Sequence, residues 1–101
     1  MTRAVLSPAA ERDILEVVEW IAAENPVAAR GFRVALDKLA TTIGEHPGIG
    51  ALKPHLASPP IRFLPIRGFP HIVVYTPERK PPLIVRVLHG ARDLPEALRE
   101  F

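Results

Sequence analysis

The sequence contains no cysteine, and this absence excludes a disulfide framework, a thiolate metal site and a cysteine nucleophile. It also lacks a long hydrophobic run, since its longest apolar stretches, such as Ile72–Tyr75, are far too short to span a bilayer. No basic and then apolar leader with a small-residue cleavage site is present. We therefore expect a soluble, cytoplasmic protein that does not associate with a membrane.

Signatures of the common enzyme classes are also missing. The sequence has no serine-hydrolase elbow, no phosphate-binding glycine loop and no dinucleotide-binding fingerprint. Ser7 is better explained as a helix cap than as a nucleophile, and Ser58 is the only other serine. The four histidines have no short metal-ligand spacing and no accompanying carboxylate pair, so we expect neither a metal site nor another cofactor. They are His46, His55, His71 and His89.

An excess of charge of one sign is nearly absent, because 13 basic and 11 acidic side chains give a net charge of +2. This value does not by itself indicate a nucleic-acid-binding protein. Residues 1–60 carry six basic and seven acidic side chains, whereas residues 61–101 carry seven basic and four acidic ones. The second part is therefore the one that would meet an anion, unless its cations only solvate strand edges and turns.

The length of 101 residues and the hydrophobic fraction of 48% predict one globular domain that spans residues 1–101. Residues 3–6 form a short apolar run that indicates a strand. Ser7 and Asn25 each precede a proline, and a capping side chain before proline is typical of a helix start. Apolar residues then recur every three or four positions, so we predict two amphipathic helices in a hairpin, the second ending near Glu45.

Three β-type runs at residues 61–67, 71–76 and 83–89 predict an antiparallel meander. Pro65 marks the first run as an edge strand or a bulge, because proline cannot donate to a neighbouring strand. Residues 48–60 predict a long loop before these runs. The order β-α-α-β-β-β predicts an α+β fold, in which the helical hairpin packs on one face of a small, mainly antiparallel sheet.

The last strand ends in a His-Gly-x-Arg-Asp corner at residues 89–93, and this corner suggests a functional site. His89 could act as a general acid near neutral pH while Arg86 and Arg92 hold a phosphate. In a regular strand, however, side-chain alternation puts Arg86 and His89 on opposite faces, which argues against a simple catalytic pair. The alternative is that His89, Arg92 and Asp93 only hydrogen-bond the end of the chain.

Trp20 is a candidate anchor for a protein partner. On a helical wheel it falls off the apolar stripe of its helix, so we expect an exposed ring of the kind that dominates interface energetics. The alternative is that the ring packs under the loop at residues 48–60 or at the edge of the hairpin. The apolar residues of the tail at 94–101 could likewise dock on the sheet or on a partner. The residues of the helical stripe are Ile14, Val17, Val18 and Ile21.

The order of the elements and four sequence segments together resemble a ParE toxin of the RelE/ParE toxin superfamily. Such proteins are cytoplasmic toxins of type II toxin–antitoxin modules, which are associated with plasmid stabilization. The resemblance implies a tightly bound ParD-like antitoxin with a ribbon-helix-helix domain, and contact with DNA only indirectly through that antitoxin. An antitoxin segment would cover an exposed apolar groove between hairpin and sheet. The four segments are Leu6–Ile14, His46–Gly50, Phe69–Tyr75 and Val87–Asp93.

The resemblance favours the ParE activity, in which the toxin traps cleaved DNA on DNA gyrase and blocks replication. Such a gyrase inhibitor is a non-enzymatic poison and needs no catalytic residue of its own. RelE toxins instead cleave messenger RNA on the ribosome with lysines, arginines and a terminal tyrosine or histidine. This chain ends in Leu98–Phe101, without either terminal residue type, and its long loop offers only Lys53.

The candidate site residues differ between these hypotheses. As partner-binding residues we predict Trp20, Arg86, His89 and Arg92. If the protein were instead a ribosome-dependent endoribonuclease of the RelE type, the catalytic residues would be His89, Arg86 and Arg67. A third hypothesis is a nontoxic relic that only binds its antitoxin.

Overall fold

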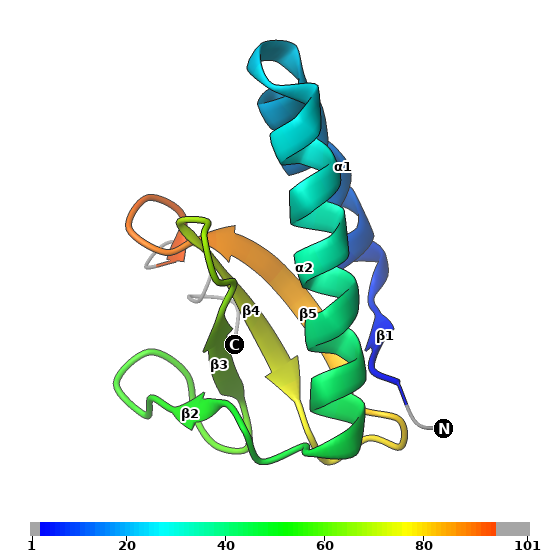
Figure 1. Ribbon diagram of the computed structural model, residues 1–101. Helices are drawn as coiled ribbons and strands as arrows, with labels where there is room; N and C mark the ends of the chain where they lie inside the picture. The colour runs from blue at the N-terminus through cyan, green and yellow to red at the C-terminus, as the bar shows by residue number, and fades with distance from the viewer. Residues whose placement is uncertain (1–2, 95–101) are drawn as a thin grey trace.

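The computed structural model describes residues 3–94, and residues 95–101 of the predicted tail lie outside this range. Two helices form an antiparallel hairpin beside a five-stranded sheet (Figure 1). The elements in chain order are β1 (Val5–Leu6), α1 (Pro8–Glu24), α2 (Pro26–Glu45), β2 (Ala51–Leu52), β3 (Arg62–Pro65), β4 (His71–Thr76) and β5 (Leu83–His89).

Local capping chemistry explains both helix starts, which the sequence predicted correctly. The Ser7 hydroxyl accepts a hydrogen bond of 3.0 Å from the Ala10 amide, and the Asn25 side-chain oxygen accepts one of 3.0 Å from the Ala28 amide. The Asn25 amide also donates to the Ile21 carbonyl at 2.8 Å. Asn25 thus ends α1 and begins α2, and this one-residue connection forces the two helices into a hairpin.

The sheet has the strand order β1-β5-β4-β3-β2. Strands β2 to β5 pair antiparallel, which confirms the predicted meander, and β1 pairs parallel with β5. Strand β1 covers β5 only at Leu83 and Ile84. Among residues 3–94, no strand pairs with this edge of β5 from Val85 onward, and this is where α1 lies.

Strand β2 is a correction to the sequence analysis, which predicted only a loop at residues 48–60. Because β2 has two residues and pairs only with Arg62 and Phe63, no period-2 pattern reveals it. The interpretation of β3 as an edge strand was accordingly wrong, since β2 lies outside it. Pro65 is nevertheless tolerated, because it lies at the end of β3, beyond the two residues that β2 covers.

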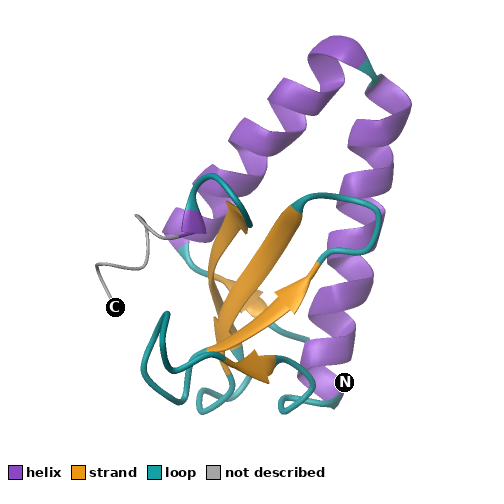
Figure 2. Ribbon diagram, turned by 90° about the vertical axis from the view of Figure 1, so that its left-hand side faces the viewer, coloured by secondary structure: helices purple, strands orange, loops and turns teal. Residues whose placement is uncertain are grey.

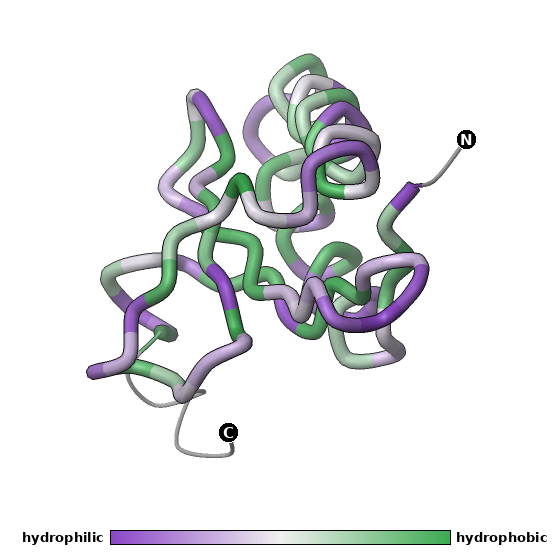
Figure 3. The backbone as a smooth tube through the Cα atoms, turned by 90° about the horizontal axis from the view of Figure 1, so that it is seen from below, coloured by the Kyte–Doolittle hydropathy of each residue, from purple (hydrophilic) through white to green (hydrophobic). Residues whose placement is uncertain are grey.

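Both faces of the sheet are buried. The helical hairpin covers one face, as predicted, and encloses Phe32, Val73, Ile84 and other apolar side chains. In Figure 2 the hairpin stands against the strands, and in Figure 3 it alternates between hydrophobic and hydrophilic stretches, as an amphipathic pair does. The other face forms a second cluster of Ala57, Phe63, Ile72, Val74, Leu88 and Leu94.

Tyr75 ties the segment after α2 to the sheet. Its fully buried hydroxyl donates to the Pro47 carbonyl at 2.7 Å and accepts from the Gly50 amide at 2.9 Å. Burial raises the pKa of Tyr75, whereas the Gly50 hydrogen bond and the charge of Arg62 oppose this shift. A Cβ at Gly50 would lie 2.8 Å from the tyrosine oxygen and 3.0 Å from the Phe63 carbonyl, so this close approach requires glycine.

We expect Tyr75→Phe to lower the free energy of unfolding by about 1–3 kcal/mol, because it leaves the Gly50 amide and the Pro47 carbonyl without their partner. Urea denaturation measures this loss. The matched control is Thr42→Ala, which removes an exposed hydroxyl that donates to the Lys38 carbonyl at 2.9 Å. The control should cost about 0.5 kcal/mol or less, and equal losses for both variants would contradict the role given to Tyr75.

Candidate partner-binding site

A groove runs between α1 and the end of β5 and encloses about 730 Å³. We call it the α1/β5 groove. Helix α1 forms one wall, the turn before β4 closes one end, and β5 with the corner that follows it forms the other wall. All four residues that the sequence analysis proposed for partner binding line this groove, namely Trp20, Arg86, His89 and Arg92.

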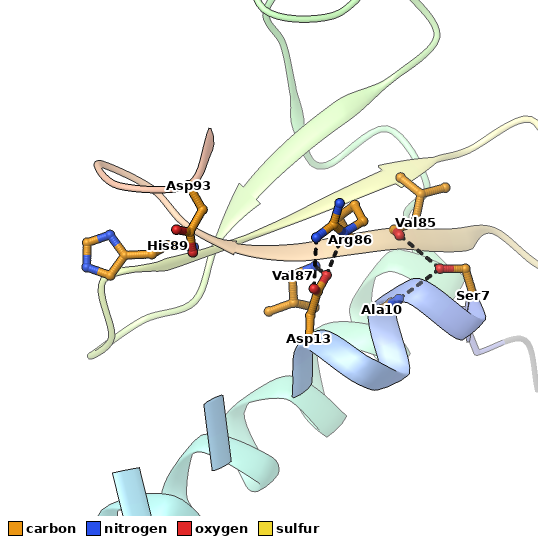
Figure 4. Close-up of polar contacts among 8 residues, drawn as sticks. All are labelled: Ser7, Ala10, Asp13, Val85, Arg86, Val87, His89 and Asp93. Carbon is orange, nitrogen blue, oxygen red and sulfur yellow. Dashed lines mark hydrogen bonds and ion pairs between the residues drawn. The ribbon is translucent and has the colours of Figure 1, made fainter. Parts of the chain in front are cut away.

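Asp13 fixes the distance between the two walls. Its carboxylate accepts from Arg86 Nε at 2.8 Å, from Arg86 Nη2 at 2.9 Å and from the Val87 amide at 2.9 Å (Figure 4). The Ser7 hydroxyl donates to the Val85 carbonyl at 2.8 Å. Helix α1 thereby supplies hydrogen-bond partners to the part of β5 that β1 does not cover.

Asp13 is a residue whose role the sequence analysis missed. Only 13% of the Asp13 side chain is exposed. The signal was present in the spacing, since Asp13 lies three residues after Ala10 and four before Val17, on the stripe that faces the core. What the sequence could not supply was its partner, which lies 73 residues further along the chain.

The corner after β5 is held by bonds among its own residues. The His89 amide donates to Asp93 Oδ2 at 3.3 Å, the Asp93 amide donates to the His89 carbonyl at 3.0 Å, and the Arg92 amide donates to His89 Nδ1 at 3.2 Å. The alternative that these residues hydrogen-bond the end of the chain concerns residues that lie outside the described range, and within that range the bonds join the corner to itself. Burial opposes the ionisation of Asp93, yet the hydrogen bonds from Arg92 and His89 hold its pKa below the usual 3.8.

His71 lies at the floor of the groove and is only 6% exposed. Its ring makes edge-to-face contacts with Phe32 at 5.4 Å and with His89 at 5.5 Å between ring centroids. Its Nδ1 is buried and has no hydrogen-bond partner among residues 3–94. Burial lowers the pKa of His71, and the positive charges of His89 and Arg92 lower it further, against an opposing effect of Asp93.

Trp20 stands on the rim of the groove with 70% of its surface exposed, so the prediction of an exposed ring is confirmed. Arg86 and His89 face the same groove, contrary to the expectation from strand alternation. Arg86 is held at this groove by its two hydrogen bonds to Asp13 of α1. Arg67 is exposed in the β3–β4 turn and does not line the groove.

Both the sequence and the fold of this chain have counterparts among known proteins. A family model described as the ParE toxin of the type II toxin–antitoxin system parDE matches residues 4–94. The chain belongs to the ParE toxin family. It is therefore a toxin of a type II toxin–antitoxin system, as the resemblance of its sequence segments implied.

A solved structure described as the chromosomal ParDE TA system from P. aeruginosa has the same fold as this ParE-family toxin. The TM-score is 0.73 at 17% sequence identity, and the alignment covers 88% of this chain and 96% of that chain. None of the curated proteins matches the sequence. Within residues 3–94, no helix is long and apolar enough to cross a membrane, and no group of three or more metal-ligating side chains comes together.

We expect Asp13→Ala to lower the free energy of unfolding by about 3 kcal/mol, because three donors on β5 lose their shared acceptor. Arg86→Ala should cost less, since the Val87 amide keeps its bond to Asp13. Urea denaturation of both single variants and the double variant measures the coupling. Glu19→Ala, which removes an exposed carboxylate from the same helix, is the control. If Asp13→Ala lowered the free energy of unfolding no more than this control does, Asp13 would not be the residue that holds α1 against β5.

A second prediction concerns pH. Because the pKa of His71 is lowered below 6.5, the unfolded chain takes up a proton before the folded protein does. Stability from this group is therefore complete above 6.5 and falls as the pH is lowered through 6.5 toward the pKa of the folded state. Asp93 contributes a separate loss only below 3.8.

Measurement of the unfolding free energy between about pH 7 and pH 5 checks this expectation. The variant His71→Phe keeps an aromatic ring against Phe32 and should have a flatter profile in that range. An unchanged slope would show that other groups cause the loss.

Proposed function

We propose that this ParE-family toxin blocks replication by binding DNA gyrase, without a catalytic residue of its own. The observation that carries the proposal is the match of the ParE toxin model to residues 4–94. The side chains that RNA cleavage would require also lie apart, because Arg67 is outside the groove and Arg86 is engaged with Asp13. A protein that acts by binding needs an exposed surface, and the hairpin with Trp20 offers one.

We further propose that a ParD-like antitoxin with a ribbon-helix-helix domain neutralises the toxin in the cytoplasm. The α1/β5 groove suits a segment of such a partner, because its walls combine apolar side chains, including Val17 and Phe69, with charged ones. The sequence analysis expected an apolar groove, whereas charged side chains such as Glu16 and Arg92 line the groove together with the apolar ones. Contact with DNA would be indirect, through the antitoxin.

Ribosome-dependent cleavage of messenger RNA is the second candidate function, and one observation favours it. The rings of His71 and His89 lie 5.5 Å apart, and Arg92 lines the same groove. Two imidazoles and a guanidinium are suited to acid–base catalysis on a phosphodiester. The burial of His71 weighs against this function. A nontoxic relic that only binds its antitoxin is the third candidate.

Inducible expression of the toxin without its antitoxin tests these alternatives. We expect DNA synthesis to stop before translation, cells to become filamentous, and purified toxin to inhibit supercoiling by gyrase. His89→Ala should keep its toxicity. Early translation arrest with cleaved messenger RNA, abolished by His89→Ala, would instead assign the protein to the ribonuclease branch. Normal growth of cells and uninhibited gyrase would leave the antitoxin-binding relic.

A further inference from the structure

The charges that line the α1/β5 groove do not balance. Asp13 pairs with Arg86, and Asp93 pairs with Arg92 at 3.2 Å. Glu16 is the third carboxylate of the lining, and it makes no ion pair or side-chain hydrogen bond with any residue in the range 3–94. Among the carboxylates and guanidinium groups of the lining, three carboxylates thus face two guanidinium groups, and the carboxylate in excess is Glu16.

Glu16 and Trp20 are neighbours on the same face of α1. They are four residues apart, a spacing that places Cβ atoms about 5–6 Å from each other on a helix surface. Both are exposed and both line the groove. An indole face beside an unpaired carboxylate is suited to one chemical group above others, a guanidinium, which stacks on the ring while its donors reach the carboxylate.

The wider surface of α1 has the same sign of charge. Although the whole chain carries a net charge of +2, the exposed surface of this helix has four carboxylates and a single basic residue, Arg12; the fifth carboxylate of the helix, Asp13, is paired with Arg86. A partner segment that lies along α1 is therefore attracted if it is basic and repelled if it is acidic. The five carboxylates are Glu11, Asp13, Glu16, Glu19 and Glu24.

From these observations we infer that the α1/β5 groove receives a basic, amphipathic segment of the antitoxin, and that an arginine of this segment stacks on Trp20 and pairs with Glu16. The inference rests on the proposed antitoxin partner and adds the chemistry by which that partner is recognised. Apolar side chains of the segment would contact Val17 and Phe69, which also line the groove. At the floor of the groove, Nδ1 of His71 has no hydrogen-bond partner among residues 3–94, so a polar atom of the segment could bond to it.

A small anion is a poorer occupant of the same groove. The guanidinium groups of Arg86 and Arg92 already bind carboxylates of the protein, so an incoming phosphate would have to compete with Asp13 and Asp93. A second copy of this chain that docked through its own α1 would bring two acidic helices against each other. Charge complementarity therefore selects the basic segment of a partner.

The test uses the full-length toxin and its full-length ParD-like antitoxin, with affinity measured by calorimetry at several salt concentrations. We expect Glu16→Gln to weaken binding about tenfold and Glu16→Lys about a hundredfold, with a smaller salt dependence for Glu16→Gln. The matched control is Glu19→Gln, which removes an exposed carboxylate of the same helix outside the groove lining. It should change affinity by less than about twofold.

The variant Trp20→Leu separates stacking on the ring from simple apolar burial. Leucine keeps apolar bulk but has no ring face, so we expect a loss of about tenfold that overlaps with the loss in Glu16→Gln when both are combined. Full additivity of the two losses would mean that the residues do not share one cation. Both side chains are exposed, and unchanged unfolding curves verify that the variants fold.

Two failures are distinguishable in this experiment. If the wild-type toxin does not bind the antitoxin, the proposed partner is wrong and the inference falls with it. If the wild-type protein binds tightly and Glu16→Lys binds equally well, the partner stands and the inference about its basic segment is overturned. Self-association of the toxin that depends on Trp20 would assign the groove to a second copy.

Discussion

The arrangement of this molecule depends on which groups hydrogen-bond the backbone along the uncovered edge of β5. Strand β1 stops after pairing with Leu83 and Ile84, so the rest of β5 would present open backbone groups. Helix α1 supplies the missing partners through the Ser7 hydroxyl and the Asp13 carboxylate. The same carboxylate holds Arg86 and sets the position of α1 on the sheet, and the width of the groove follows from that position.

The extent to which the sequence predicted this structure depends on how local each interaction is. The caps at Ser7 and Asn25 were predictable, because each bonds an amide only three residues away. Strand β2 was not, since its pairing with Arg62 and Phe63 crosses a proline-rich loop and leaves no periodic signal. The four candidate partner-binding residues meet in one groove only because β5 has an open edge, and no pattern within the strand reveals that edge.

Charge is segregated in the folded protein more strongly than in the sequence. Residues 61–101 carry more basic than acidic side chains. In the folded protein, however, Arg86 and Arg92 of the groove form ion pairs with Asp13 and Asp93. The four glutamates of α1, by contrast, remain exposed. The exposed surface of α1 is therefore acidic, although the protein as a whole has a net positive charge.

The core of this toxin is complete without a partner. Both faces of the sheet are buried by residues of the chain itself. The tip of the helical hairpin extends beyond the strands (Figure 1). Trp20 and Val27 of the hairpin are exposed and belong to neither apolar cluster. Asp13 bonds α1 to β5 at the groove, so the proposed binding of an antitoxin segment would require little rearrangement of the toxin backbone. The entropic cost of association then falls mainly on the partner segment that becomes ordered. In the proposed complex, Trp20 and Glu16 would keep that cost low, because one helix already holds the indole and the carboxylate side by side before the partner binds.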